Sequence, residues 1–576
     1  MVFLLVEELW WIFNSKNKQK LFKKRFTFNY MKDNDILVIC LENAIKYEGK
    51  ADIGSVIGKI LGKDPSLKSN INEIKQVVIK LVKEVNSLSL EQQNKRFKDL
   101  GGKIEEKKEE KHDLFAFLNI KQGEKIVTAF PPEPSKYPHI GHAKAILLNY
   151  ELAKKYKGKF ILRFEDTNPT LAKKEFYKIH LENYKWLNII PDKIDYASDH
   201  MKEFYKYAEI LIKDDKAYCC TCSQDIVKEN RFKSIACDCR SRSIEENLKL
   251  WKKMPKMKEN SIILRLKIDL NHQNTTMRDP TIFRIIKASH PRLKKKFTVW
   301  PNYDFENSIM DGLEGITHRL RTKEFELRAE LQHYIQNALG LKETSSYEFA
   351  RFNLEGTESS GRIIREKIKN KEMTGWDDPS LTTLVALKRR GFLPEAIKDF
   401  VLSTGISKSE STLKWDDLIL HNKRLLDPKV NRYFFIINPE RIEIKNAPKI
   451  TAKLPLHPEF KRGFRILKTN GKFYIQDKLE NNKVYRFMHL FNFKNLTYLS
   501  TNYDEKLNAK LIHWLPISKD LAKVEVLMPS KEIKKGLAEP SIKKLKVNDI
   551  IQFERMGFVR LDKKTKNKLF FYFSHN

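Results

Sequence analysis

The sequence predicts a multidomain protein in which an α/β domain with a parallel sheet is followed by a helical region and an all-β C-terminal region. Its 576 residues exceed what one hydrophobic core supports, so several domains are expected. Residues 125–168 show strand, loop, helix and strand patterns in succession, the repeating unit of a parallel sheet. Beyond Pro428, apolar and polar residues alternate between turn signals, which indicates antiparallel β structure.

The N-terminal residues 1–30 are an extension of uncertain structure. Their apolar run MVFLLVEELWWIF is too short to span a bilayer, contains two glutamates and lacks the basic leader of an export signal. A better-patterned segment begins at Met31, so the translation start stays open between Met1 and Met31. The chain has only six cysteines, and a disulfide framework is not expected. The sequence therefore predicts a cytoplasmic protein with no membrane partner.

The remaining elements follow in chain order. Residues 31–100 predict a helical domain, because apolar residues recur at three- and four-residue spacing in INEIKQVVIKLVKEVNSL. A charged linker is predicted over 101–118. In the α/β domain, predicted over 119–345, KIVTAF and KFILRFEDTN are strands and HIGHAKAILLNYELAKKY is the helix between them. Helices dominate over 346–430 and strands over 431–576.

The charge of the chain favours a polyanionic partner. Lysine and arginine number 109 against 74 acidic residues, a formal net charge of +35. Nucleic acid is the first candidate partner, and a lysine-rich composition inherited from the genome is the alternative. The basic stretch PRLKKKF (291–297) and the helical-region residues Arg389 and Arg390 are candidate contacts to phosphates.

The tetrapeptide His139-Ile140-Gly141-His142 opens a helix that follows a strand and a proline-rich loop. At such a helix start, free backbone N–H groups and the helix dipole favour anionic phosphate oxygens. The two imidazoles lie three residues apart on one helix face and can donate to the same oxygens, while Gly141 lets a base or ribose approach the backbone. A metal site is less favoured, because zinc-binding helices usually separate their histidines by four residues. The tetrapeptide therefore predicts a nucleotide site.

The segments around this motif resemble the class I aminoacyl-tRNA synthetases of the glutamyl and glutaminyl subgroup, with archaeal-type glutamyl-tRNA synthetases as the closest fit. The resemblance rests on FPPEPSKYPHIGHAKAILLNY, LRFEDTNP, YDFENSIMDGLEGITHRLRTKEF, TGWDDPSL and the tail from IHWLP to the end. It implies a Rossmann catalytic domain with an inserted acceptor-stem domain at about 210–300, a helical subdomain, and two β-barrels that read the anticodon.

The resemblance also implies the phosphate side of the site. His139 and His142 are expected to hold the phosphates of ATP as charge builds on the leaving pyrophosphate, with Mg²⁺ assisting. The residues expected to bind ATP are Pro132, His139, Gly141, His142 and Ser360.

On the amino-acid side, the resemblance implies that Glu165 takes the amino group of the substrate and that Tyr303 lies beside it. Glu133 is expected to bind the amino acid as well. Arg321 stands where glutaminyl enzymes have a small residue, and its guanidinium can pair with a γ-carboxylate through two hydrogen bonds. Glutamate is therefore expected over glutamine.

Four cysteines form a paired array. Cys220 and Cys222 are separated from Cys237 and Cys239 by a spacing that can close four thiolates around tetrahedral Zn²⁺. The resemblance implies a structural zinc knuckle in the inserted domain. Cys219 can take the place of one of these four cysteines as a ligand. The alternative is a set of reduced cysteines that bind no metal.

Two positions depart from the family pattern. Ala129 stands where an arginine helps to hold the amino acid, and Gly361 stands where the second signature has a lysine. Arg362, or Arg365 one turn later, is expected to replace that lysine as the catalytic cation. Removing one donor aimed at the transition state typically costs ~3 kcal/mol.

Three functions therefore compete. The favoured one is a monomeric glutamyl-tRNA synthetase that uses ATP, L-glutamate and tRNA(Glu), with tRNA(Gln) left open as a second acceptor. The alternatives are a tRNA-binding paralogue without the chemistry, which the two departures favour, and a glutaminyl-tRNA synthetase, which Arg321 disfavours.

Overall fold

The structure is a computed structural model that describes residues 33–47, 49–102, 113–121, 123–358, 360–410 and 412–576. The extension at 1–30 lies outside these residues, as does most of the linker predicted over 101–118. The chain divides into two compact units, residues 1–113 and 114–576. No helix among the described residues is long and apolar enough to cross a membrane.

The first unit is helical, in agreement with its apolar spacing. Its α-helices are α2 (Asp33–Lys46), α3 (Ile53–Lys63), α4 (Ile71–Asn86) and α5 (Leu90–Asp99). The predicted three- and four-residue spacing buries one face of α4, where Ile74, Val78, Val82 and Val85 lie in the core of the unit. A capping box at Ser89 begins α5.

The second unit is built on a five-stranded parallel sheet of order β3-β2-β1-β8-β9. The strands are β1 (Val127–Phe130), β2 (Lys159–Phe164), β3 (Lys193–Tyr196), β8 (His318–Thr322) and β9 (Ser345–Phe349). The strand order reverses between β1 and β8, and ligands of open parallel sheets bind at such a switch point, beyond the carboxyl ends of the strands.

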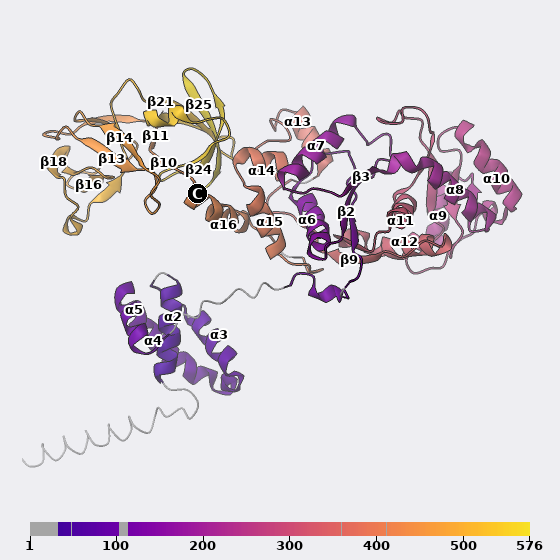
Figure 1. Ribbon diagram of the computed structural model, residues 1–576, viewed down its shortest axis with the longest axis horizontal. Coiled ribbons are helices and arrows are strands. Elements are labelled where there is room, and N and C mark those ends of the chain that lie inside the picture. The colour runs from indigo at the N-terminus through magenta and orange to yellow at the C-terminus, as the bar shows by residue number, and fades with distance from the viewer. Residues whose placement is uncertain (1–32, 48, 103–112, 122, 359, 411) are drawn as a thin grey trace, which may run out of the picture. The chain divides into compact units, whose positions relative to one another are not determined.

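Helices cover both faces of this sheet. They are α6 (Ile140–Lys155), which links β1 to β2, and α7 (Lys174–Trp186), α11 (Tyr303–Glu314) and α12 (Glu326–Ala338). The helix α8 (Met201–Lys213) follows β3 and packs with the inserted residues after it. Figure 1 shows α6 on one side of the sheet and α11 with α12 on the other. Arg163 of β2 ties α11 to the sheet through buried ion pairs with Asp311 and Glu314, at 2.9 and 2.6 Å.

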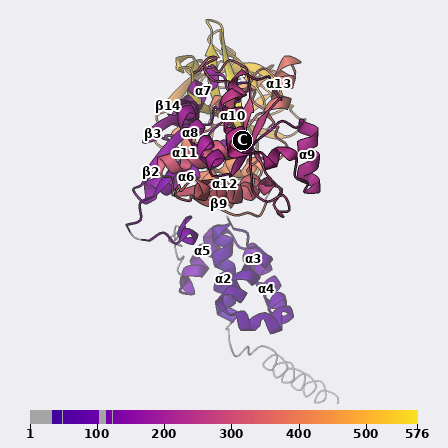
Figure 2. The same ribbon diagram turned by 90° about the vertical axis from the view of Figure 1, so that its right-hand side faces the viewer.

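A second, antiparallel sheet interrupts the chain between β3 and β8. It has the order β4-β5-β6-β7, with strands β4 (Ala217–Cys220), β5 (Ile263–Leu266), β6 (Thr281–Ile285) and β7 (Val299–Pro301). The helices α9 (Gln224–Lys233) and α10 (Ile244–Lys253) connect β4 to β5 and are in view in Figure 2. The structure thus contains an insertion in the region where one was expected.

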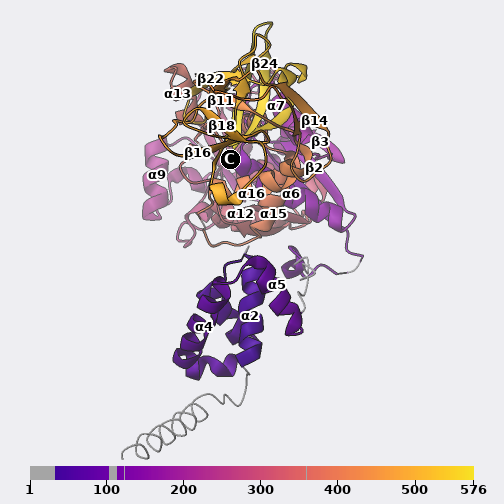
Figure 3. The same cartoon turned by 90° about the vertical axis from the view of Figure 1, so that its left-hand side faces the viewer.

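Four helices follow β9, namely α13 (Gly361–Lys369), α14 (Leu384–Arg390), α15 (Pro394–Ser403) and α16 (Trp415–Leu426). All strands after residue 430 form β-sheets, which face the viewer in Figure 3. The largest has the order β10-β23-β24-β25-β21-β22-β11, with strands β10 (Arg432–Tyr433), β11 (Phe435–Ile437), β21 (Ala522–Leu527), β22 (Ile533–Ala538), β23 (Ile550–Phe553), β24 (Gly557–Lys564) and β25 (Lys568–His575).

The smaller sheets pack around an aromatic core that includes Phe473, Phe487 and Trp514. Their strands are β12 (Glu440–Glu443), β13 (Thr451–Pro455), β14 (Phe464–Lys468), β15 (Lys472–Ile475), β16 (Val484–Phe487), β17 (Asn492–Lys494), β18 (Thr497–Ser500), β19 (Lys510–Ile512) and β20 (Leu515–Pro516). The predicted fold class, α/β with helical regions and an all-β C-terminal part, is confirmed.

One expectation for the helical region is wrong. Arg390 is buried, 4% exposed, and donates to the backbone oxygen of Ser574 at 2.7 Å, so it joins α14 to β25 rather than facing a phosphate. Arg389 is held by Asp377 and Asp562, at 2.6 and 2.9 Å. The sequence showed their charge but could not show that the C-terminal strands cover this helix end.

Candidate functional site

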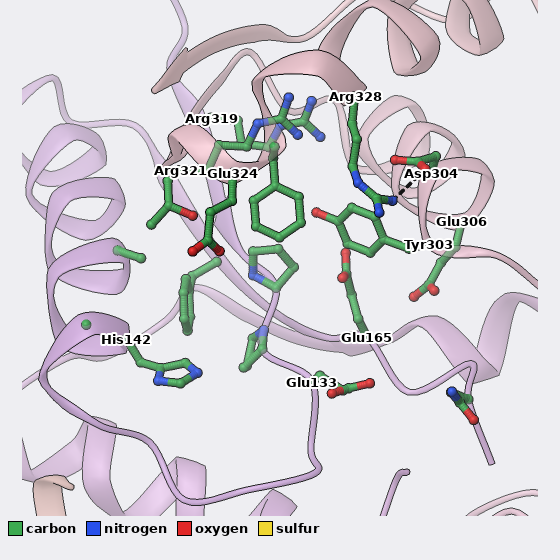
Figure 4. Close-up of a pocket in the computed structure, with 18 of the residues that line it drawn as sticks. Glu133, His142, Glu165, Tyr303, Asp304, Glu306, Arg319, Arg321, Glu324 and Arg328 are labelled. Atoms are coloured by element: carbon green, nitrogen blue, oxygen red, sulfur yellow. Dashed lines mark hydrogen bonds and ion pairs between the residues drawn. The ribbon is translucent and has the colours of Figure 1, made fainter. Parts of the chain in front are cut away.

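A cavity of about 700 Å³ lies at the carboxyl edge of the parallel sheet. It is lined by the ends of β1, β2 and β8 and by the first turns of α6 and α11 (Figure 4). This is the size and place of a small-molecule site in an open α/β sheet. The cavity brings together eight predicted residues: Pro132, Glu133, His139, Gly141, His142, Glu165, Tyr303 and Arg321.

The first turn of α6 is fixed by its own histidines and by a neighbouring segment. The Gly141 N–H donates to His139 Nδ1 at 3.1 Å, and the His139 N–H donates to His142 Nδ1 at 3.3 Å. Backbone hydrogen bonds from Ile140 to Thr382 and from Leu384 to Pro138, at 3.0 and 2.9 Å, hold the helix start in place. A Cβ at Gly141 would lie 2.8 Å from His139 Cε1 and 3.1 Å from the Phe352 oxygen, so any side chain there would displace the His139 ring.

Both histidines of this turn are neutral. Burial, aided by the Lys136 and Arg351 charges, lowers the pKa of His139 to about 3. Burial also holds the pKa of His142 well below its ordinary value. Because each Nδ1 accepts a backbone N–H, the single proton of each ring resides on Nε2. The N–H groups of His139, Ile140 and Gly141 already have acceptors, so the donors that the helix start offers are the two imidazole Nε2–H groups. Placed at the positive end of the helix dipole, they suit phosphate oxygens.

Glu165 follows β2 and is 8% exposed. Its Oε1 accepts a hydrogen bond from Asn307 Nδ2 at 2.7 Å and lies 3.6 Å from Arg163 Nη2. Burial raises its pKa to about 8 although Arg163 acts in the opposite direction. A cationic amino group entering the cavity would favour the ionised carboxylate. Tyr303, the first residue of α11, lines the same part of the cavity (Figure 4).

Two buried arginines of β8 differ in how their donors are used. Arg319 donates to Asp311 at 2.6 Å, to Gln332 at 2.8 Å, to Ser346 at 2.9 Å and to Asn307. Arg321 donates from Nη1 to Gln332 at 2.8 Å, whereas its Nε and Nη2 find no hydrogen-bond acceptor among the described residues. A buried guanidinium with unused donors at a cavity wall fits a carboxylate ligand.

The segment that carries the second signature contributes fewer residues to the cavity lining than expected. Ser360 precedes α13 and Arg362 is an exposed residue of its first turn, and neither lines the cavity. Arg365 Nη1 reaches the backbone oxygen of Ser135 at 3.4 Å. Ala129 points away from the cavity into an apolar cluster with Val127, Ile161 and Ile316.

The cavity also contains charged residues that the sequence pattern did not single out. Lys136 and Arg351 line its phosphate side, and Arg328 lines the opposite side, where it pairs with Asp304 at 2.8 Å. Glu306 is buried and accepts a hydrogen bond from Thr167. Lys136 lies three residues before the helix start, so its place in the first signature was a usable signal. No such sequence signal exists for Arg328 and Arg351, because only the fold brings them to the cavity.

The cysteine array closes in the insertion. The sulfur atoms of Cys220, Cys222, Cys237 and Cys239 all lie within 4.8 Å of one another, with Cys220–Cys237 at 3.8 Å and Cys222–Cys239 at 3.9 Å. Sulfur ligands about 2.3 Å from a tetrahedral Zn²⁺ stand at such separations. Cys219 is excluded from the set, because its thiol is buried on the other side of β4 and lies 3.5 Å from the Asn247 oxygen.

Comparisons with known proteins agree with this geometry. Residues 125–428 match the catalytic domain of the class I tRNA synthetases (E and Q), and residues 430–510 and 481–562 match anticodon-binding domains of the same class. A glutamate–tRNA ligase of Pyrococcus furiosus is 41% identical over 94% of this chain and 99% of its own. One of Methanocaldococcus jannaschii is 40% identical over 94% of this chain and 100% of its own.

Proposed function

The chain belongs to the class I tRNA synthetases of the E and Q family, and from this membership we propose that it is a glutamate–tRNA ligase. It activates L-glutamate with ATP and transfers the glutamyl group to the 3′ end of tRNA(Glu). The observation that carries the choice of glutamate is the buried Arg321 guanidinium in the cavity lining, two of whose donors find no hydrogen-bond acceptor among the described residues.

At the phosphate end, ATP places its phosphates against the first turn of α6. The Nε2–H groups of His139 and His142 donate to the phosphate oxygens at the positive end of the helix dipole. Pro132 and Gly141 leave room for the nucleoside. Mg²⁺, when bound, neutralises phosphate charge and is held largely by the phosphates themselves, so a dedicated carboxylate cage is not needed.

At the amino-acid end, Glu165 takes the substrate ammonium and Arg321 the γ-carboxylate, with Tyr303 beside the substrate and Glu133 at the rim. An α-carboxylate oxygen of glutamate then attacks the α-phosphorus of ATP. The bond to the β-phosphate oxygen breaks, pyrophosphate leaves, and glutamyl-adenylate remains. In the second step a ribose hydroxyl of the terminal adenosine attacks the activated carbonyl and AMP leaves.

The four cysteines of the insertion fit a structural zinc ion. The thiolates of Cys220, Cys222, Cys237 and Cys239 would hold the ion, which would then tie β4 to the turn at residues 237–241. Arg265 Nη1 lies 4.0 Å from the sulfur atoms of Cys220 and Cys237, so a cation beside them offsets the negative charge of a four-thiolate site.

The proposed acceptor is tRNA(Glu), and parallel charging of purified tRNA(Gln) measures whether the second acceptor is used. Light scattering during size-exclusion chromatography tests the expected monomer. The cytoplasmic location stays a prediction.

Pyrophosphate exchange with glutamate, run with and without tRNA, tests the function. Exchange under either condition, with glutamate preferred over glutamine, supports the ligase. The competing function is a tRNA-binding protein without the chemistry, and Gly361 and Ala129 favour it. Absence of exchange under both conditions, with tRNA still bound, would leave only that function.

A further inference from the structure

The phosphate side of the cavity lacks a cation at the place where the family resemblance expects one. Gly361 begins α13 and carries no side chain, and the adjacent Arg362 is exposed and outside the cavity lining. His139 and His142 do not supply the charge, since both are neutral. A leaving pyrophosphate accumulates negative charge, and a preorganised cation is the usual way to stabilise it.

Lys136 occupies the space beside Gly361. A Cβ built on Gly361 would lie 3.2 Å from Lys136 Cδ and 3.6 Å from Lys136 Cβ. The hydrocarbon part of Lys136 therefore lies in contact with the place where a side chain at position 361 would begin, and would have to shift slightly to admit one. Lys136 also lines the cavity together with His139 and His142. Lys136 and Gly361 are thus in contact although their segments are distant in sequence.

The backbone of Lys136 is held firmly. Its carbonyl oxygen lies 2.9 Å from His180 Nε2, and the other nitrogen of that ring lies 2.8 Å from the Tyr184 hydroxyl. Both side chains come from α7 and are buried. The next residue, Tyr137, stacks on Trp376 with ring centroids 5.1 Å apart. Such a fixed backbone loses little entropy when the side chain engages a ligand.

The Lys136 ammonium is available to a ligand. Within the described part of the chain it forms no ion pair, and Glu133 and Glu324 act on it only through space. Burial lowers its pKa, and the same ammonium lowers the pKa of His139 and of His142, which places it within electrostatic reach of both rings. An anionic ligand at the α6 start would restore the favoured charge of the lysine.

We propose that Lys136 supplies to the triphosphate of ATP the positive charge that Gly361 cannot, so that the second-signature lysine has been replaced by a lysine from the adjacent loop that precedes α6. The proposal rests on the proposed ligase function. The contact between the Lys136 chain and position 361 also places the lysine next to the position that it would replace.

Three variants test this assignment in full-length protein by pyrophosphate exchange. Lys136→Met keeps the hydrocarbon chain and removes the charge, so the exchange rate should fall about a hundredfold with the KM for glutamate little changed. The exchange rate of Lys136→Gly should fall by a similar factor. Lys136→Gly combined with Gly361→Lys moves the cation to the adjacent start of α13 and should recover most of the parental rate. Lys174→Met, an exposed lysine outside the cavity, is the matched control and should behave as the parent.

The outcomes separate the two proposals. An active parent whose rate survives Lys136→Met would overturn the role of Lys136 alone, as would a double variant no faster than Lys136→Gly. A parent that shows no exchange would overturn the ligase function and the role of Lys136 with it. Rescue by the double variant also excludes misfolding as the cause of the loss, because a folding defect at position 136 would persist in it.

Discussion

Arg321 provides the sharpest test of substrate choice, because its guanidinium is buried with two donor groups unused. Two hydrogen bonds from these donors to a γ-carboxylate contribute about 1.5–3 kcal/mol each. Arg321→Met therefore removes ~3–6 kcal/mol of substrate interaction, and kcat/KM for glutamate should fall about 10²–10⁴-fold. The preference for glutamate over glutamine should shrink by a comparable factor.

The same substitution should leave folding stability almost unchanged. Gln332 Oε1, which accepts from Arg321, keeps its hydrogen bond from Arg319 at 2.8 Å. Glu348, 3.7 Å from Arg321 Nε, keeps Lys408 at 3.6 Å. Replacing a buried, incompletely paired charge by an apolar side chain is often neutral or stabilising. The expected change in the free energy of unfolding is within ~1 kcal/mol.

Arg319→Met is the matched control on the same strand. Arg319 donates to four side chains, one of them Asp311 at 2.6 Å, so its loss should destabilise the fold by ~3 kcal/mol. Urea unfolding measures the stability of both variants, and exchange with glutamate and with glutamine measures specificity. Equal destabilisation of the two variants, or an Arg321→Met enzyme that keeps its glutamate activity, would refute the assignment of Arg321.

Three further predictions concern the metal, pH and the domain contact. Cys222→Ser, or treatment with a strong chelator, should release one zinc per chain by mass spectrometry and lower the melting temperature; a parent purified without zinc contradicts this. Because burial raises the Glu165 pKa to about 8 and the substrate ammonium needs the carboxylate, the KM for glutamate should fall as pH rises toward 8, by up to about tenfold per unit, and Glu165→Gln should abolish the trend. Arg390→Met should cost ~1–3 kcal/mol of stability and leave the salt dependence of tRNA binding unchanged. A flatter salt dependence in this variant would show that Arg390 does contact a phosphate.

Local patterns predicted the sheet and the helix start because their physical causes are local. The alternation of strand, proline loop and helix at 125–168 places the α6 start at the edge of the sheet without knowledge of any distant residue. The cysteine register was also predictable, although only the fold excludes Cys219, whose thiol lies on the other face of β4.

The sequence could not predict which distant residues provide hydrogen-bond partners for the buried arginines. Arg319 and Arg321 are two residues apart on β8 and share a face of the strand, so a sequence pattern cannot show that one is saturated and the other is not. The same holds for Arg390, whose burial depends on a strand near the C-terminus. Charge is visible in a sequence, but its partners are set by tertiary structure.

The neutral state of the two signature histidines changes how the phosphate end must be understood. The Nε2–H groups orient phosphate oxygens but add no net charge, so neutralisation has to come from Mg²⁺ and from cations of the cavity wall. Lys136 and Arg351 are the cations that line that side among the described residues. Arg351 is largely exposed, which weakens its field by solvent screening. The half-buried Lys136 is therefore the less screened of these two fixed charges, and the one better placed to replace a lysine at position 361.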